Sequence, residues 1–250
     1  MRIIAGVLLL LAAASAFAAT SQTVSYPSGS ETVQAVMYTP AGKGPFPALV
    51  VIHEWWGLND WVKEQASKLA GQGYVTLAVD LYRGPVAATP EEAHELSRGL
   101  PRDRAQRDLL AAVDFLGKNQ SVNPRRIGVI GWCMGGGYAL DLAMAAPHLA
   151  AAVVNYGRLA TDPETLKKIQ APILGIFAGK DRGIPPADVQ RFQQQMKELG
   201  KRVEVTIFPD AGHAFENPNN QAGYRPADAA KAWELTVDFL RRTLPAATKK

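Results

Sequence analysis

Short apolar runs alternate with amphipathic stretches along most of the chain. Strands are predicted at 23–26, 32–38, 48–53, 74–79, 127–130, 151–155, 173–178 and 203–208. Helices are predicted at 59–72, 91–97, 103–118, 138–146, 187–199 and 227–244. In the third of these helices Leu109, Val113 and Leu116 share one face. Strands that alternate with helices predict an α/β fold, with a mostly parallel sheet covered by helices on both faces.

The first 18 residues have a different character. A positive start at Arg2 is followed by an uncharged apolar run over 3–14, and "AFA" at 16–18 is typical of a signal-peptidase site. Polar residues follow instead of a positive flank, which argues against a membrane anchor. We therefore expect a signal peptide over 1–18 and a single domain over 19–250. The mature protein is expected to be periplasmic or secreted, without stable membrane association.

The charge and cysteine content exclude several kinds of partner. The 27 basic and 23 acidic residues give a formal charge of +4 and are scattered, which does not indicate a nucleic-acid surface. One cysteine allows no intramolecular disulfide and no cysteine-based zinc site. We expect no metal and no cofactor. The oligomeric state stays open, with a monomer as the working expectation.

That single cysteine lies between a predicted strand and a run of glycines. The segment "GWCMG" around Cys133 is a G-x-C-x-G version of the nucleophile elbow, in which the nucleophile sits on a sharp strand-to-helix turn. Small residues flank it because the two backbones nearly touch. The N-terminus of the next helix favours negative charge on the sulfur. The alternative is a small buried hydrophobic residue, which is common for a free cysteine.

Two further polar residues follow predicted strands. Asp181 comes directly after the strand at 173–178, and His213 follows the strand at 203–208. The chain order of nucleophile, acid and histidine is that of α/β-hydrolase triads. In such a triad the histidine moves the proton and the carboxylate orients its ring. Cys133, Asp181 and His213 are therefore the predicted catalytic residues.

The chain resembles the dienelactone hydrolase family (carboxymethylenebutenolidase), whose nucleophile is a cysteine. The segments that carry the resemblance are "VIHEWWGLN", "VDLYRG", "GWCMGGG", "GKDRGIP" and "GHAF", within a similarity that extends from about 23 to about 245. It implies the α/β-hydrolase fold and hydrolysis of a small-molecule ester or lactone. It also implies that Cys133 is the nucleophile, Asp181 the acid and His213 the base.

The segment "HEWWG" adds further expectations. By the resemblance, Glu54 takes part in activating the thiol when substrate enters, and burial among indoles would make its charged form costly. The backbone N–H groups of Trp55 and Met134 are expected to form the oxyanion hole. Trp55, Trp56 and Trp61 are expected to line the pocket, although at least one of these tryptophans is expected to pack in the core. Trp56 is assigned to substrate binding.

The substrate clamp departs from the family pattern. The characterised enzyme of the family holds its substrate's carboxylate with two arginines. Arg83 lies near one of these positions, and Asn217 stands at the other. Arg83 and Asn217 are therefore assigned to substrate binding. Since Arg83 is the only pocket cation that the motif places, we expect a weakened preference for anionic or strongly polar substrates.

The sequence leaves three alternatives open. The same triad fits a broad-specificity carboxylesterase or thioesterase. A thiol-based redox or binding module would use Cys133 by oxidation, but it does not require Asp181 and His213 at the next strand ends. A non-catalytic binder on the hydrolase fold is disfavoured because every triad position is filled.

Overall fold

The computed structural model describes residues 19–245, so the predicted signal peptide lies outside the described residues. The strands are β1 (Thr20–Ser28), β2 (Glu31–Thr39), β3 (Phe46–Ile52), β4 (Val75–Val79), β5 (Val122–Trp132), β6 (Ala151–Asn155), β7 (Ile173–Ala178) and β8 (Val203–Phe208). The helices are α1 (Asp60–Gly71), α2 (Pro90–Arg98), α3 (Arg102–Gly117), α4 (Met134–Ala145), α5 (Pro163–Leu166), α6 (Pro186–Glu198) and α7 (Pro226–Thr243). Each predicted strand and helix is present.

One mixed sheet organises this part of the chain. Its strand order is β1-β2-β4-β3-β5-β6-β7-β8. β1 and β2 pair antiparallel at one edge, and β2 also runs antiparallel to β4. All the remaining pairs, from β4 through β8, are parallel. The carboxyl ends of these parallel strands meet at one edge, where ligands bind in open α/β sheets.

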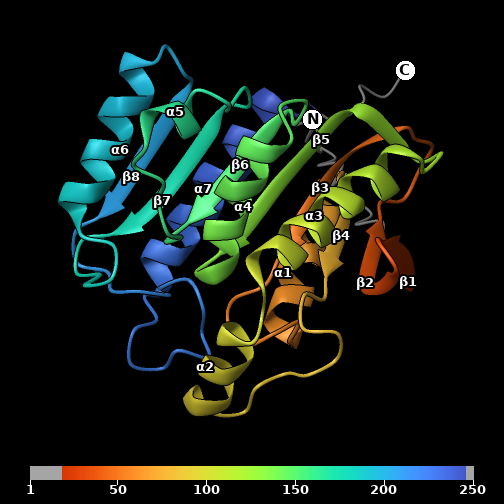
Figure 1. Cartoon of the computed structure of the whole chain (residues 1–250), viewed down its shortest axis with the longest axis horizontal. Helices are drawn as coiled ribbons and strands as arrows, with labels where there is room; N and C mark the ends of the chain where they lie inside the picture. Colours follow the sequence, from red (N-terminus) through yellow and green to blue (C-terminus); the bar gives the residue numbers. More distant parts are fainter. Residues whose placement is uncertain (1–18, 246–250) are drawn as a thin grey trace, which may run out of the picture.

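Helices cover both faces of the sheet (Figure 1), because β3 to β7 present buried apolar side chains to each side. On one face α3, α4 and α6 supply core residues such as Leu109, Leu140 and Phe192. On the other face α1 and α7 supply Leu69 and Phe239, among others. The arrangement is an α/β fold with a mostly parallel sheet, as the sequence predicts. Among residues 19–245, no helix has both the length and the apolar character needed to cross a bilayer.

Two local features differ from the sequence-based expectation. Helix α4 begins at Met134, four residues before the predicted start, and so it includes the glycine run. A Cβ on Gly136 would lie 2.6 Å from the Asn155 carbonyl oxygen, so the glycines allow the helix to start against neighbouring strands. The sequence predicts the helix only from residue 138; glycine disfavours helices, and tertiary contacts override that preference here. Helix α5, only 4 residues long, was not predicted.

Candidate active site

Cys133 lies in the turn between β5 and α4. Its backbone has a positive φ, a conformation that residues other than glycine rarely adopt. Its φ is 54° and its ψ is −118°. Its N–H donates to the Asn155 carbonyl at 3.0 Å, which fixes the turn to β6. A Cβ on Gly131 would overlap the Gly135 carbonyl, and one on Gly135 would overlap that of Ile52. Glycines on both sides are therefore required, and the strain holds the thiol at the carboxyl edge of the sheet.

The three predicted triad residues come together in one line. His213 follows β8, and its Nε2 lies 3.0 Å from the sulfur of Cys133. Its Nδ1 lies 2.6 Å from Oδ2 of Asp181, which follows β7. The other carboxylate oxygen of Asp181 accepts the N–H groups of Gly183 at 2.8 Å and Ile184 at 3.2 Å. The acid is thus held by its own turn, and it orients the imidazole toward the sulfur.

The electrostatics of this line favour a positive imidazole. Burial lowers the pKa of His213, but hydrogen bonds and charges from Asp181 and Cys133 outweigh burial and raise the pKa to about 10. Burial raises the pKa of Asp181, but its bonds to His213 and to the turn N–H groups outweigh burial, so the pKa is lowered overall. The geometry can therefore hold an imidazolium between a carboxylate and the sulfur.

Glu54, which follows β3, is buried beside this line with only 1% of its surface exposed. Its Oε2 accepts a hydrogen bond from Nδ2 of Asn217 at 2.6 Å, and its Oε1 accepts one from the Tyr156 hydroxyl at 3.4 Å. Burial raises the pKa of Glu54 to about 7, although both hydrogen bonds and the charge of His213 act to lower it. Glu54 can therefore change its protonation state near neutral pH.

Sequence reasoning missed Tyr156. It directly follows β6 and packs edge-on against His213, with ring centroids 5.3 Å apart. Its hydroxyl reaches Glu54, so it contacts two of the predicted catalytic residues at once. The signal that identified Asp181 and His213, a polar side chain in the loop after a predicted strand, was also present in "VVNYG".

A cavity of about 760 Å³ opens over the sulfur, a size typical of small-molecule sites. It is lined by Glu54, Trp55, Trp56, Asn59, Val86, Ala87, Ala88, Cys133, His213, Ala214, Asn217, Asn219, Asn220, Gln221 and Ala222. Trp61 instead packs edge-on against Trp132 in the core, at 5.4 Å between ring centroids. Among the described residues, no lysine or arginine lines this cavity.

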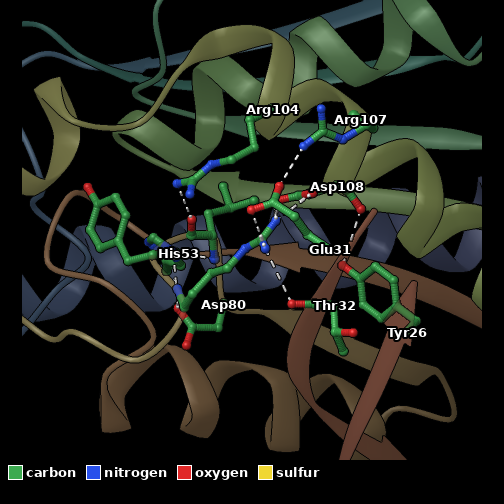
Figure 2. A network of polar contacts seen from close by, with 11 residues as sticks. Tyr26, Glu31, Thr32, His53, Asp80, Arg104, Arg107 and Asp108 are labelled. Carbon is green, nitrogen blue, oxygen red and sulfur yellow. Dashed lines mark hydrogen bonds and ion pairs between the residues drawn. The ribbon is translucent and has the colours of Figure 1, made fainter. Parts of the chain in front are cut away.

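Arg83, which the sequence assigns to substrate binding, does not line the cavity. Its guanidinium pairs with Asp108 at 2.9 Å and with Glu31 at 3.1 Å, and it also donates to the Thr32 carbonyl. Figure 2 labels these three partners. The side chain therefore points to α3 and to the start of β2. The cause is the turn after β4, where Arg83 itself takes a φ of 62°. The expected preference for anionic substrates loses its basis.

The two backbone N–H groups expected at the oxyanion hole belong to residues beside the cavity. Trp55 lines it, and Met134 begins α4 immediately after Cys133. Within residues 19–245, no hydrogen bond occupies either N–H group. Within the same range, no three His, Cys, Asp or Glu side chains are grouped to hold a metal ion.

The sheet, its helices and the turn at Cys133 define an α/β-hydrolase fold. The sequence profile of the dienelactone hydrolase family matches residues 33–244, and the chain belongs to this family. A carboxymethylenebutenolidase-like protein of Aquifex aeolicus is 32% identical over 230 residues, which is 89% of this chain and 99% of the relative. One from Methylorubrum extorquens is 31% identical over 233 residues, 88% of this chain and 80% of the relative.

Solved structures agree with this placement. A dienelactone hydrolase-like protein from Klebsiella pneumoniae superposes with a TM-score of 0.82 at 25% identity, covering 90% of this chain and 99% of that one. An acylaminoacyl peptidase from Pyrococcus horikoshii, 17% identical with a TM-score of 0.73, shares the fold; the match covers 93% of this chain and 43% of that one. The chain is thus a hydrolase of the dienelactone hydrolase type.

Proposed function

We propose that this protein hydrolyses a small, uncharged ester or lactone through a Cys133–His213–Asp181 triad. The observation that carries the proposal is the unbroken line from the sulfur to Nε2 at 3.0 Å and from Nδ1 to the carboxylate at 2.6 Å, at the floor of a cavity. Oxidation of a thiol does not require that line, which disfavours the redox alternative. A broad carboxylesterase or thioesterase on the same triad differs only in substrate range.

The reaction proceeds in two halves. The Cys133 thiolate attacks the carbonyl carbon, and the C=O electron pair moves to the oxygen, which the N–H groups of Trp55 and Met134 stabilise. When the tetrahedral intermediate collapses, the alkoxide leaves with the proton from Nε2 of His213, and a thioester remains. Water then gives a proton to Nε2 and attacks the thioester, which releases the acid and restores the thiolate.

Glu54 takes part in activating the thiol in this scheme. It lines the same cavity as Cys133, and its carboxylate stabilises positive charge on His213. Only the ionised form of Glu54 stabilises this positive charge. Asn217 and Tyr156 hydrogen-bond to this carboxylate and so favour its ionisation at neutral pH.

The lining of the cavity supports an uncharged substrate. Asn217, assigned to the substrate clamp from the sequence, is already bonded to Glu54. The buried carboxyl of Glu54 disfavours a second carboxylate nearby, and neutral amides of Asn59, Asn219 and Gln221 make up much of the polar lining. A carboxylate on the substrate would therefore lack the bidentate arginine partner that makes such contacts strong.

The test is a matched pair of aryl esters that differ only by a distal carboxylate. We expect kcat/KM to be at least about 10-fold higher for the neutral ester, since desolvating an unpaired charge is costly. Equal or higher kcat/KM for the acidic ester would contradict the neutral-substrate assignment. No turnover of either ester, or of small lactones, would contradict the hydrolase mechanism itself.

We also propose export after cleavage behind Ala18, which rests on the sequence of residues 1–18. Mass spectrometry of periplasmic or secreted protein is expected to show a chain beginning at Ala19. A cytosolic chain that retains Met1 or Arg2 would contradict this.

A further inference from the structure

The peptide group between Glu54 and Trp55 is held from outside the cavity. Its carbonyl oxygen lies 2.5 Å from Nδ1 of His53 and accepts the N–H of Gly57 at 3.3 Å. In a trans peptide the N–H points opposite to the carbonyl. Whatever fixes the Glu54 carbonyl therefore also fixes the direction of the Trp55 N–H.

The hydrogen bonds of His53 determine its tautomer. Nε2 accepts the backbone N–H of Leu81 at 3.3 Å, so this nitrogen carries no proton. The proton is then on Nδ1, which donates to the Glu54 carbonyl. His53 is completely buried, and this burial lowers its pKa, which keeps the ring neutral. The imidazole thus acts as a fixed neutral donor.

The turn after β4 holds the other side of this ring. The carboxylate of Asp80 accepts the N–H groups of Tyr82, Arg83 and Gly84 at 3.1, 3.0 and 2.7 Å. The Leu81 carbonyl accepts from Arg104 at 3.1 Å. Figure 2 shows His53 beside this turn, with Asp80 and Arg104 around it.

The same turn also reaches the next peptide. The hydroxyl of Tyr82 donates to the Trp55 carbonyl at 3.0 Å. The peptide group after Trp55 is therefore bonded directly to the turn after β4, through Tyr82. The peptide group before Trp55 is connected to the same turn through His53.

We propose that His53 is a positioning residue that keeps the Trp55 N–H directed into the oxyanion hole by donating from Nδ1 to the Glu54 carbonyl. The inference rests on the proposed function, because it assigns the Trp55 N–H to the developing oxyanion. His53 has no contact with the reacting atoms and does not line the cavity. A rotated Glu54–Trp55 peptide would present the carbonyl in place of the donor, which repels an oxyanion.

Two substitutions separate the two hydrogen bonds of His53. His53→Asn places an amide where Nδ1 lies, so a donor to the Glu54 carbonyl is kept and the acceptor for Leu81 is lost. His53→Gln reaches the Nε2 position instead, so the acceptor is kept and the donor is lost. For His53→Gln we expect kcat for a neutral aryl ester to fall at least about 10-fold with KM little changed, as for loss of an oxyanion donor. His53→Asn is expected to retain most of the wild-type kcat.

Alkylation of Cys133 by iodoacetamide is the internal control. This displacement at a saturated carbon forms no oxyanion, so its rate is expected to be the same in His53→Gln as in the wild type. If His53 only stabilises the fold, the loss of kcat in each variant parallels the fall in its melting temperature. His53→Asn, with the smaller side chain, would then lose at least as much kcat as His53→Gln. Equal losses of kcat in the two variants, or no loss in His53→Gln, would overturn the proposal.

A measurement on the unmodified protein keeps the proposal testable if a variant fails to fold. Long-range nitrogen–proton NMR spectra are expected to show His53 neutral, with the proton on Nδ1; a proton on Nε2, or on both nitrogens, would overturn it. A separate result tests the proposed function itself. Ester turnover in the wild type that persists in Cys133→Ala contradicts the cysteine mechanism, whereas cysteine-dependent turnover with normal kcat in His53→Gln contradicts only the role of His53.

Discussion

The turns after β3 and β4 leave adjacent parallel strands, yet they place their side chains in opposite directions. After β3, Glu54, Trp55 and Trp56 line the cavity over the sulfur. After β4, Asp80 binds three successive N–H groups, and the turn directs Arg83 to Asp108 and Glu31. The carboxyl end of a parallel strand is therefore not enough to place a side chain in the site. The turn conformation decides whether the residue meets substrate or holds the residues that do.

The largest effects on kcat are expected from substitutions of the proposed triad residues beside the cavity. Asp181→Asn removes the charge that stabilises the His213 imidazolium and exchanges an acceptor for an amide that can impose the wrong tautomer. We expect kcat to fall by about 10³–10⁴-fold, by analogy with the serine triad. Steady-state kinetics on a neutral aryl ester measures this. A fall of less than about 10-fold would show that the acid of the triad lies elsewhere.

For the turn after β4, substitutions are expected to lower the stability of the fold and to leave substrate selectivity unchanged. Arg83→Met leaves the carboxylate of Asp108, whose side chain is fully buried, without its ionic partner. We expect the free energy of unfolding to fall by about 3 kcal/mol, as for a broken buried ion pair. Urea denaturation measures this. The kcat/KM ratio for the acidic and neutral esters is expected to stay as in the wild type.

Arg107→Met is the matched control, since Arg107 pairs with the same Glu31 but is 43% exposed in its side chain. We expect it to cost less than about 1 kcal/mol, as for a surface ion pair. If Arg83→Met lowers kcat/KM only for the acidic ester, Arg83 reaches the substrate, and the contrast between the two turns fails.

The smallest expected effect is a shift in pH dependence. Burial raises the pKa of Glu54 to about 7, so the helpful carboxylate is lost as the pH falls through this value, and kcat/KM is expected to fall with it. Glu54→Gln should remove this acid limb. Asn217→Ala removes a hydrogen bond that lowers the pKa, so the limb should move to higher pH.

Asn219→Ala is the control, because Asn219 lines the same cavity but makes no side-chain bond to Glu54 within the described residues. It is expected to leave the midpoint where it is in the wild type. An acid limb that persists in Glu54→Gln would assign this titration to another group.

Much of the fold, and the candidate catalytic residues that the fold brings together, could be predicted because short-range patterns carry them. The strand at 173–178 is a continuous buried apolar run, and Asp181 and His213 stand in the loops that follow the strands at 173–178 and 203–208. The start of α4 could not be predicted. Glycine disfavours helices locally, and only the close approach of the Ile52 and Asn155 carbonyls shows why Gly135 and Gly136 lie inside one.

The surroundings of Arg83 and Asn217 could not be predicted, for a different physical reason. The side chain of Arg83 is directed by a positive φ and by partners on β2 and α3, and one strand-end motif does not encode these. Asn217 was correctly placed at the cavity, but its bond to Glu54 joins residues 163 positions apart in the chain. Pairings at such separation arise from the tertiary fold and leave no local pattern.

The most direct test of the central claim is the kcat of Cys133→Ala for a neutral ester that the wild type turns over. We expect a loss on the order of 10³-fold or more, as for removal of a triad nucleophile. We also expect one equivalent of iodoacetamide, mapped to Cys133, to abolish turnover in the wild type. An alanine variant that folds normally and keeps near-normal esterase activity would contradict the cysteine mechanism.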